Sequence, residues 1–364
     1  MPDRRSLQKQ KKKKKKKRLI AWILTPILVL ALGATTYGAY LYNQAKEVVN
    51  DSYKPVDRTS AKRMEDVTPK VDNVSILFIG VDASMTRGQN GARSDALLLA
   101  TFNQKAKSVK LLSIPRDSYV YIPSEGKQDK ITHAHANGGV ASTIETVEGF
   151  LDVPVDYYVK VNFEAFVDIV DALGGIKADV PYTLTEQNSN DQQGAITLQK
   201  GMQQLNGEQA LALARTRHYD NDIERGKRQQ EILEAIMNKA LSAKSFTKYS
   251  DLMKAVGKNM ETDLTFDQMK SFFNYAAAGP NLDIQSLTLK GSDLYLSNGV
   301  NNIYYYQLDE ANLSEIKATL KTQLGLADSS DSSQTDVGTT GSDGTTVGSN
   351  NTDSAAGVTD SGSN

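Results

Sequence analysis

Short aliphatic runs separated by polar turns dominate the central part of the chain. The runs Val74–Gly80, Ala96–Phe102 and Val109–Ile114 are each bounded by Gly, Pro, Asn or Lys. Brief, wholly apolar runs with such boundaries are typical of buried β-strands. The turn Asn103–Lys107, which joins the second run to the third, predicts a hairpin and therefore a sheet with an antiparallel part.

A different period, with apolar residues every three or four positions, predicts helices later in the chain. The best-marked helix, Phe163–Leu173, has Asn162 as its N-cap and the pair Gly174-Gly175 as its stop. Strands are predicted on both sides of this helix, at Asp156–Phe163 and Ile176–Val180. Strand, helix and strand in this order indicate a crossover unit in a partly parallel sheet.

The remaining pattern completes an α/β fold with a central mixed β-sheet flanked by helices. The glycine-containing segment Tyr121–Gly139 is expected to form a loop. Further helices are expected over Val140–Leu151, Ile223–Leu241, 246–257, 265–277 and 308–323, and further strands over 284–290 and 293–297.

The first 42 residues predict a membrane anchor. Residues 1–18 carry eleven Lys and Arg against one acidic residue, Asp3, and the uncharged apolar stretch Leu19–Tyr42 follows directly. That stretch exceeds the roughly 20 residues that a helix needs to cross a bilayer. A cleaved signal peptide is the alternative, but the apolar run is long for one, and Tyr37–Tyr40 makes a poor cleavage site.

Charge also sets the expected topology. Because Lys and Arg flanks stay in the cytoplasm, we expect a single-pass cell-membrane protein with a cytoplasmic N-terminus and everything after Asn43 extracellular. The absence of Cys fits an exported protein without disulfides. A lysine run also occurs in nucleic-acid-binding proteins, but its place against an apolar stretch favours a topogenic role, so we expect no nucleic-acid partner.

Composition divides the chain into five parts. After the cytoplasmic basic tail 1–18 and the transmembrane helix 19–42, the polar residues 43–70 predict an extracellular stalk. Residues 71–325 are long enough for one domain with a sizeable core. Residues 326–364 are dominated by Ser, Thr, Gly and Asp, a composition that predicts disorder.

Charged side chains stand at the ends of the three predicted central strands. Asp82 follows the first strand. Arg93 and Asp95 precede the second, and Arg116 follows the third. Strand ends are a usual place for a functional site, and carboxylates beside guanidinium groups are suited to hold a metal ion and a phosphate together. The alternative is that these side chains cap turns or form surface ion pairs of little energetic value.

A second basic cluster lies around the start of the predicted Ile223–Leu241 helix. Arg215 and Arg217 point the same way in an extended chain. Arg225 and Arg228 share one face of the first helical turn, where the helix dipole already favours an anion. Four converging guanidinium groups would make an oxyanion receptor, whereas the alternative is a solvated helix start paired with its own acidic residues.

Catalytic motifs of other classes are missing from the sequence. It contains no Gly-x-Ser-x-Gly elbow, no Walker A loop and no His-Glu-x-x-His. A serine or zinc hydrolase mechanism therefore has no support.

Seven segments carry a specific set of motifs, in which Ser-Ile-Pro-Arg-Asp is combined with Arg-x-Arg and Arg-x-x-Arg-Gln. They are IGVD (79–82), ARSDALLLATFN (92–103), LLSIPRDSYVYIP (111–123), KITHAHANGG (130–139), VDYYVKVNFEAFVDIVDALGGI (155–176), LNGEQALALARTR (205–217) and DIERGKRQQ (222–230). In type and order they resemble the LytR-CpsA-Psr family, over about Val74 to Ile236. A short cytoplasmic tail followed by one spanning helix is also similar to the family's layout.

The resemblance implies an extracytoplasmic phosphotransferase of cell-wall biogenesis. Such an enzyme takes an anionic glycopolymer, wall teichoic acid or capsule, from a polyprenyl pyrophosphate carrier. It joins the polymer to peptidoglycan through a phosphodiester, with Mg²⁺ (or Mn²⁺) as cofactor. The resemblance also implies an apolar lipid tunnel, for which the Phe163–Leu173 helix and the Ile232–Leu241 stripe are the candidate linings.

By motif match, the resemblance also gives the charged residues their roles. Asp82 and Asp95 would hold the metal, and Asp117 or Asp95 would accept the proton of the attacking hydroxyl. The expected pyrophosphate-binding residues are Arg93, Arg116, Arg215, Arg217, Arg225 and Arg228. The expected catalytic residues are Arg93, Asp95, Arg116, Asp117, Arg215 and Arg217.

Two other classes of function stay open. A hydrolase that cleaves the lipid-linked pyrophosphate would use the same site with water as acceptor. A membrane-anchored envelope regulator is the third possibility, although the 18-residue tail is too short for a DNA-binding fold. The expected partners are the lipid-linked glycopolymer, peptidoglycan and the membrane.

Overall fold

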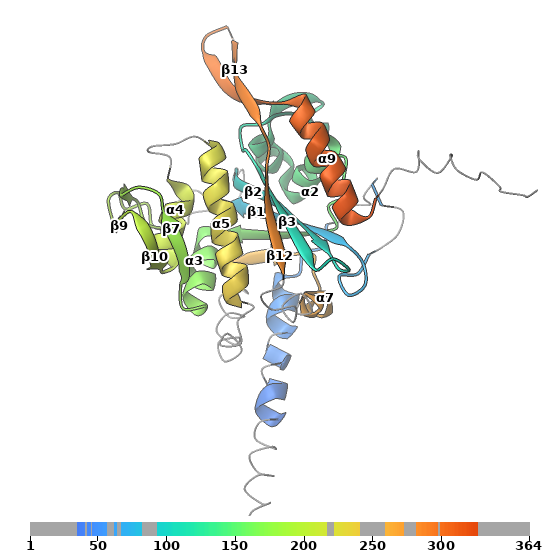
Figure 1. The fold of residues 1–364 in the computed structure, drawn as a ribbon, viewed down its shortest axis with the longest axis vertical. Coiled ribbons are helices and arrows are strands. Elements are labelled where there is room, and N and C mark those ends of the chain that lie inside the picture. The colour runs from blue at the N-terminus through green and yellow to red at the C-terminus, as the bar shows by residue number, and fades with distance from the viewer. Residues whose placement is uncertain are drawn as a thin grey trace, which may run out of the picture. The chain divides into compact units, whose positions relative to one another are not determined.

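A mixed sheet of six strands lies at the centre of the molecule (Figure 1). Its strand order is β11-β6-β1-β2-β3-β12. The central strands β1, β2 and β3 are antiparallel neighbours, whereas β6 runs parallel to β1 and β12 parallel to β3, which confirms the predicted mixed sheet. The strands are β1 (Val74–Val81), β2 (Ser94–Asn103), β3 (Ser108–Ile114), β6 (Tyr157–Asn162), β11 (Met260–Thr262) and β12 (Asp283–Thr288).

The computed structural model describes ten ranges of the chain: residues 35–40, 42–44, 46–56, 62–63, 67–81, 93–216, 222–240, 259–272, 282–297 and 299–326. Most of the predicted spanning stretch, the predicted helix 246–257 and the tail after Leu326 lie outside these ranges. Within them, no helix combines the length and apolar character needed to cross a membrane. The transmembrane helix therefore stays a prediction.

The predicted hairpin between the second and third strands is confirmed. Its turn is closed by the side chain of Asn103, whose Oδ1 accepts a hydrogen bond from the Ala106 N–H at 2.8 Å. Lys107 takes the left-handed conformation, with φ 52°, that brings the chain back into β3. This turn fixes the register in which Leu97 lies opposite Ile114.

Two helices, α2 (Ile131–Leu151) and α9 (Glu310–Leu324), cover one face of the sheet. Leu77, Leu99 and Leu112 point into this layer and are fully buried, together with Ile144 of α2 and Leu320 of α9. This face forms the main core of the protein, and α9 confirms the helix predicted near 308–323.

On the opposite face lie the helices α3 (Phe163–Ala172), α4 (Gly207–Arg215) and α5 (Asp222–Ala240), and Met269 of a further short helix also packs there. The N-cap predicted for α3 is confirmed, because Asn162 Oδ1 accepts a hydrogen bond from the Ala165 N–H at 2.8 Å. The long amphipathic helix predicted from Ile223 is confirmed as α5.

The loop predicted over Tyr121–Gly139 is wrong. The segment forms a small hairpin, β4 (Tyr119–Ile122) and β5 (Lys127–Lys130), joined by the turn η1 (Pro123–Glu125), and α2 then begins at Ile131. In the sequence, the pair Gly138-Gly139 suggests the end of a regular element. In the structure, Gly139, with φ 64° and ψ −150°, only kinks α2, which continues beyond it.

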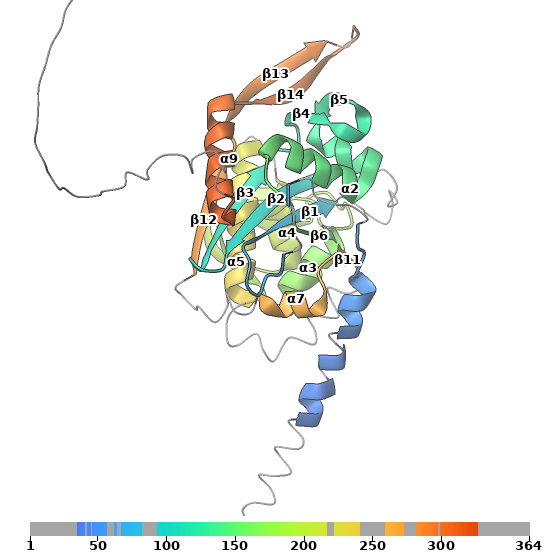
Figure 2. The same ribbon diagram turned by 90° about the vertical axis from the view of Figure 1, so that its right-hand side faces the viewer.

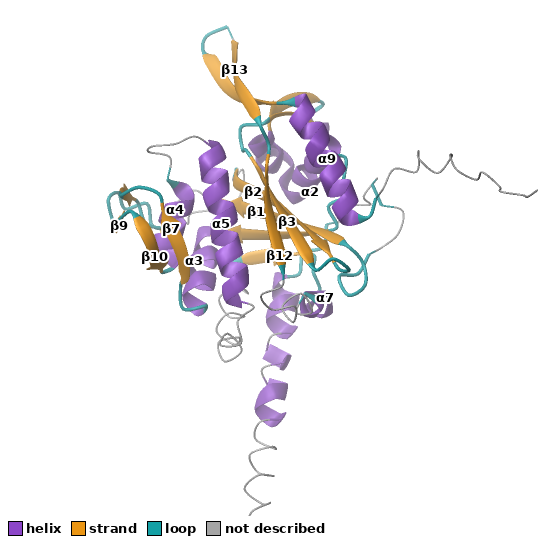
Figure 3. Cartoon of the chain, viewed as in Figure 1, coloured by secondary structure: helices purple, strands orange, loops and turns teal. Residues whose placement is uncertain are grey.

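The predicted crossover unit is also wrong in its second strand. Strand β7 (Ile176–Val180) does not join the central sheet but pairs in antiparallel fashion with β10 (Gly201–Leu205). Gly174 and Gly175 both have positive φ, at 78° and 79°, and turn the chain away after α3. With the short pair β8 (Leu184–Glu186) and β9 (Ile196–Leu198), these strands form a side subdomain around α3 and α4 (Figure 3).

A hairpin of β13 (Gly291–Ser297) and β14 (Asn302–Leu308) extends away from the body of the molecule (Figures 1 and 2). The strands predicted near 284–290 and 293–297 correspond to β12 and β13, whereas β14 was not predicted. The helix predicted at 265–277 is described only as α7 (Phe266–Ser271).

Part of the segment before the sheet packs on the domain. Val49 is buried, and the Tyr158 hydroxyl donates a hydrogen bond to the Lys54 carbonyl at 2.6 Å. Further along, Arg63 Nε lies 2.8 Å from Asp156 Oδ1. Residues in the predicted stalk range are thus anchored to the end of β6.

Candidate functional site

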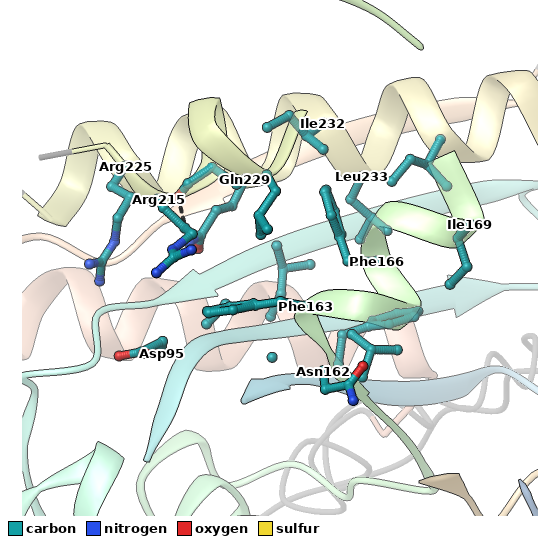
Figure 4. Close-up of a pocket in the computed structure, with 18 of the residues that line it drawn as sticks. Asp95, Asn162, Phe163, Phe166, Ile169, Arg215, Arg225, Gln229, Ile232 and Leu233 are labelled. Atoms are coloured by element: carbon teal, nitrogen blue, oxygen red, sulfur yellow. Dashed lines mark hydrogen bonds between the residues drawn. The ribbon is translucent and has the colours of Figure 1, made fainter. Parts of the chain in front are cut away.

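A cavity of about 460 Å³ lies between the central sheet and the helices α3, α4 and α5 (Figure 4). Its volume is within the range of small-molecule sites, about 300–1,000 Å³. One part of its wall is apolar and another is charged, so the site is described below in these two parts.

The apolar part is built from the sheet and two helices. Side chains from the sheet, from α3 and from α5 face one another across the space. They are Phe78, Leu98 and Val159 of the sheet, Phe163, Phe166 and Ile169 of α3, and Ile232, Leu233 and Ile236 of α5. Both segments predicted as tunnel linings therefore line this cavity.

The charged part, which we call the arginine mouth, consists of Arg116, Arg215 and Arg225 with Asp95. Figure 4 shows Arg215 and Arg225 on one side and Asp95 on the other, around the same opening. Glu186 also lines the cavity, so the whole wall carries three guanidinium groups and two carboxylates. Guanidinium groups gathered at one opening suit a phosphate or pyrophosphate group, because each can donate two parallel hydrogen bonds to its oxygens.

Asp95 and Arg116 are brought together by the register of the sheet. Leu97 of β2 pairs with Ile114 of β3, and the same antiparallel register continued by two residues places Asp95 opposite Arg116. The Asp95 carboxylate and the Arg116 guanidinium form an ion pair. The pair holds the Arg116 side chain at the edge of the cavity.

Arg215 is positioned by its own helix and by the side subdomain. It is the last residue of α4, and its guanidinium stacks over the Phe163 ring at 4.3 Å. Its Nη2 lies 3.5 Å from Asp191 Oδ1, and its Nη1 donates a hydrogen bond to the Asn188 carbonyl at 3.4 Å. The loop that carries Asn188 and Asp191 therefore borders the arginine mouth.

Arg225 lies in the first turn of α5. The next residue, Gly226, has no side chain and lets this helix lie close to β3. A Cβ on Gly226 would lie 2.6 Å from Ser113 Oγ, so any larger residue would push α5 away from β3. Arg225 is 5% exposed, and Gln229, one turn later on the same helix, also lines the cavity. The close approach thus carries a buried guanidinium and an amide to the site.

Arg228 has a different environment from the other arginines of the cluster. It does not line the cavity and is 5% exposed. Its guanidinium donates hydrogen bonds to the carbonyls of Leu213 at 3.2 Å and Thr216 at 2.7 Å. Arg228 therefore ties α5 to the end of α4, the segment that carries Arg215.

The other predicted site residues are placed as follows. Arg93 is exposed and does not line the cavity. Asp117 also lies outside the cavity; its Oδ1 is 2.8 Å from Lys130 Nζ, and its Oδ2 is 3.8 Å from Arg116 Nε. Asp82 and Arg217 lie outside the described residues.

Several polar residues of the cavity wall were not predicted: Asn162, Glu186, Gln187 and Gln229. Gln229 has a sequence signal, because it follows Arg225 by four positions and must share its helical face. No sequence signal marks Glu186 and Gln187 as wall residues. They belong to the side subdomain, and its position beside the sheet depends on contacts between segments far apart in the chain.

Carboxylates at the cavity are described groups that could hold a metal ion. No cluster of three His, Cys, Asp or Glu occurs in the described ranges. Mg²⁺ is commonly held by one or two carboxylates together with phosphate oxygens of the substrate. Asp95, at the arginine mouth, is a carboxylate of that kind.

Comparison with known proteins gives one family. The model of the LytR_cpsA_psr family matches residues 39–322 of this chain. Over 308 residues the chain is 41% identical to the polyisoprenyl-teichoic acid–peptidoglycan teichoic acid transferase TagT of Bacillus subtilis (strain 168), covering 83% of this chain and 93% of TagT.

Solved structures match as well. A structure of TagT bound to LIIa-WTA is 41% identical, with a TM-score of 0.62, and the match covers 74% of this chain and 97% of that one. A second, of the LytR-CPS2A-psr family protein YwtF (TagT) with bound octaprenyl pyrophosphate lipid, is 38% identical with a TM-score of 0.59, covering 75% of this chain and 99% of that one.

Proposed function

Because this chain belongs to the LytR-CpsA-Psr family, we propose that it transfers an anionic glycopolymer, wall teichoic acid or a similar polymer, from polyprenyl pyrophosphate to peptidoglycan. Relatives that share about two fifths of its residues are named as teichoic acid transferases. A similar structure holds octaprenyl pyrophosphate. The enzyme is thus a phosphotransferase that forms a phosphodiester.

One observation supports this proposal most directly: the cavity joins an apolar wall to the arginine mouth. A polyprenyl pyrophosphate has the same two parts, a long hydrocarbon tail and a doubly charged head. Phe166 and Ile236 would contact the tail, while Arg116 and Arg215 would bind the phosphate oxygens. Neither a purely polar nor a purely apolar ligand would match both walls.

In the proposed reaction, a sugar hydroxyl of peptidoglycan attacks the phosphorus that carries the glycopolymer. A new bond forms between the acceptor oxygen and this phosphorus, and the bond to the bridging oxygen breaks. Polyprenyl monophosphate leaves with the bonding electron pair. Negative charge grows on the oxygens around the phosphorus, where guanidinium groups fixed in advance stabilise it.

The carboxylates take two roles in this proposal. Asp95, which lines the cavity, would hold Mg²⁺ together with Asp82, and the ion would neutralise charge on the phosphate oxygens. Asp117, outside the cavity and beside Arg116, would accept the proton of the acceptor hydroxyl. Chelation is therefore expected to stop transfer, and added Mg²⁺ or Mn²⁺ to restore it.

The decisive experiment uses purified protein, a lipid-linked polymer donor and peptidoglycan. Arg116→Ala is expected to lower transfer by about 10²-fold or more, the effect of removing one oxyanion-stabilising donor. A variant that kept wild-type transfer would remove Arg116 from the mechanism. Lys105→Ala is the control, because Lys105 is an exposed basic residue in the β2–β3 turn and does not line the described cavity, and it is expected to keep wild-type transfer.

Product analysis separates this function from its two alternatives. Polymer attached to peptidoglycan identifies a transferase, whereas free phosphorylated polymer identifies a hydrolase. An envelope regulator would depend on the tail rather than the site. In that case, deletion of the lysines in residues 11–17 would abolish the phenotype while Arg116→Ala would not.

We also propose that the domain lies outside the cell, anchored by the stretch Leu19–Tyr42 with the basic tail in the cytoplasm. The support is the charge asymmetry across this stretch, with eleven Lys and Arg before it. Protease added to intact spheroplasts is expected to digest the domain; full protection would refute this topology.

A further inference from the structure

A cluster of tyrosine rings lies near the arginine mouth but has no role in the reaction described above. The cluster, which we call the tyrosine strip, contains Tyr119 of β4, Tyr295 of β13, and Tyr304 and Tyr305 of β14. Tyr304 and Tyr305 are consecutive in β14 and leave opposite faces of the hairpin, so the cluster consists of two ring pairs, both approached by Lys130. The ring centres of Tyr119 and Tyr305 are 4.8 Å apart, and those of Tyr295 and Tyr304 are 5.5 Å apart. Both pairs meet at an angle of 62°, an edge-to-face arrangement.

The strip is partly open to solvent. Tyr295 is 61% exposed, and the other three rings are half-buried. Tyr121, two residues after Tyr119 and thus on the same side of β4, is 55% exposed. The hairpin that carries much of the strip extends from the body of the molecule (Figure 2). The Tyr119–Tyr305 contact joins β4 to β14, and the exposed part of the cluster stays accessible to a ligand.

Lys130 connects the tyrosine strip to the site. Its Nζ lies 5.6 Å from the centre of the Tyr305 ring and 5.8 Å from that of Tyr304. The same Nζ is 2.8 Å from Asp117 Oδ1, and Asp117 Oδ2 is 3.8 Å from Arg116 Nε. Two side chains, Lys130 and Asp117, therefore connect the strip to the Arg116 guanidinium, which lines the cavity.

The direction of approach distinguishes this surface from the cavity. With the lipid-linked donor in the cavity, the acceptor has to reach the phosphorus from outside it. Neither Asp117 nor Lys130 lines the cavity. Asp117 lies beside Arg116, and Lys130 lies beside Asp117. The tyrosine strip is thus linked to Arg116 through two residues that lie outside the cavity assigned to the donor.

The chemistry of the strip suits a sugar chain. A tyrosine ring presents a flat apolar face, on which the C–H face of a sugar ring can stack, and a hydroxyl that can bond to the sugar's hydroxyl groups. The pair Tyr119 and Tyr305, next to Lys130, offers such contacts to a sugar. Lys130, whose ammonium group pairs with Asp117, lies beside these rings and can also donate a hydrogen bond to a carboxylate or hydroxyl of the chain.

We propose that the tyrosine strip and Lys130 dock a glycan strand of peptidoglycan and direct one of its sugar hydroxyls to Asp117 and the phosphorus held by Arg116. This inference rests on the transferase function proposed above. It adds the surface that binds the acceptor, separate from the cavity that binds the donor.

The test measures transfer by the full-length protein from a fixed lipid-linked donor to soluble, uncrosslinked peptidoglycan glycan chains of increasing concentration. The double variant Tyr119→Ala/Tyr305→Ala is expected to raise the KM for the glycan about 10-fold or more, because two stacking contacts are lost. Its affinity for the donor, measured by binding alone, is expected to stay that of the wild type. The matched double variant Tyr119→Phe/Tyr305→Phe keeps both rings and is expected to restore most of the acceptor affinity.

Two further variants keep the test decisive. Val300→Ala, on the same hairpin at a position 86% exposed, is the control and is expected to keep the wild-type KM. If the double alanine variant unfolds, Tyr295→Ala replaces it, since that side chain is largely exposed. An unchanged KM for the glycan overturns the proposal, as does a variant that loses only self-association in sedimentation while its KM stays constant.

The two proposals fail in different ways. If the wild type transfers no polymer at all, the transferase function itself is wrong. If the wild type transfers polymer and the tyrosine variants do so with the same KM for the glycan, only the docking surface is wrong.

Discussion

The two faces of the central sheet are made by the same strands but differ in how they are covered. On the face under α2 and α9, Leu77, Leu99 and Leu112 are fully buried in a continuous core. On the other face, Phe78 and Leu98 border an open cavity beneath α3, α4 and α5. Successive side chains of each strand point alternately to the two faces, so both faces receive apolar side chains from the same strands. The difference between the faces therefore comes from the helices that cover them.

This contrast shows where the protein keeps apolar surface for a ligand. Leaving apolar area uncovered costs about 25 cal/mol per Å², so an unfilled space beside an otherwise packed sheet opposes stability. The hollow face also carries the arginine mouth, whereas the packed face carries no comparable group of guanidiniums in the described ranges. The packed face therefore stabilises the fold, and the hollow face is the one we assign to the donor.

The largest expected effect compares one truncation on each face. Leu99→Ala, in the packed core, is expected to lower the free energy of unfolding by about 2–5 kcal/mol. Ile236→Ala, at the cavity wall, is expected to cost clearly less, because this side chain already borders empty space. Urea denaturation of both variants measures the difference, and equal losses would contradict the contrast between the faces.

A substitution that fills the hollow face is expected to have the next largest effect. Ile236→Trp places a larger ring in the space assigned to the polyprenyl tail. Donor affinity is expected to fall about 10-fold or more, equivalent to about 1.4 kcal/mol, while the thermal midpoint stays close to that of the wild type. Tight donor binding by this variant would place the tail elsewhere. Leu313→Trp, beside the packed core, is the matched control and is expected to change stability but not donor affinity.

The smallest expected effect concerns an ion-pair cluster at the rim of the packed face. Lys321 and Lys62 lower the pKa of Asp152 from 3.8 to about 2. Because the pKa is lower in the folded state, the cluster contributes stability above pH 3.8 and loses it as the pH falls toward 2. The Asp152 side chain is 39% exposed, so solvent screening should keep this contribution under about 1 kcal/mol.

The corresponding experiment compares Asp152→Asn with the wild type across pH. The variant is expected to be slightly less stable at pH 7, with the difference shrinking toward pH 2. Asn tolerates the left-handed conformation of this position, φ 55°, so a backbone effect is avoided. A difference that stayed constant with pH would exclude the ion pairs as its cause.

Much of the site could be predicted from the sequence. Asp95 and Arg116 stand at the ends of neighbouring strands joined by a short hairpin, and Arg225 stands at the start of an amphipathic helix. These placements depend on strand length, turn length and helical period, which are properties of short segments. The four residues of the arginine mouth were all among the candidates, and the structure brings them to one cavity.

Arg228 shows what local pattern does not determine. By spacing it shares a helical face with Arg225, and both were expected to bind pyrophosphate. In the folded protein one guanidinium lines the cavity and the other binds the carbonyls of Leu213 and Thr216. Which partner a guanidinium reaches depends on how α5 packs against α4 and against β3, where Gly226 lies close to Ser113.

The sequence alone therefore determined the central strands, the cap of α3, the helix α5 and the charge at the strand ends, because each follows from contacts within a few residues. The tertiary structure decided that β7 leaves the sheet, that α2 continues through Gly139, and that one face of the sheet stays hollow. These outcomes arise from packing between segments far apart in the chain, where the available partners exist only after the chain has folded.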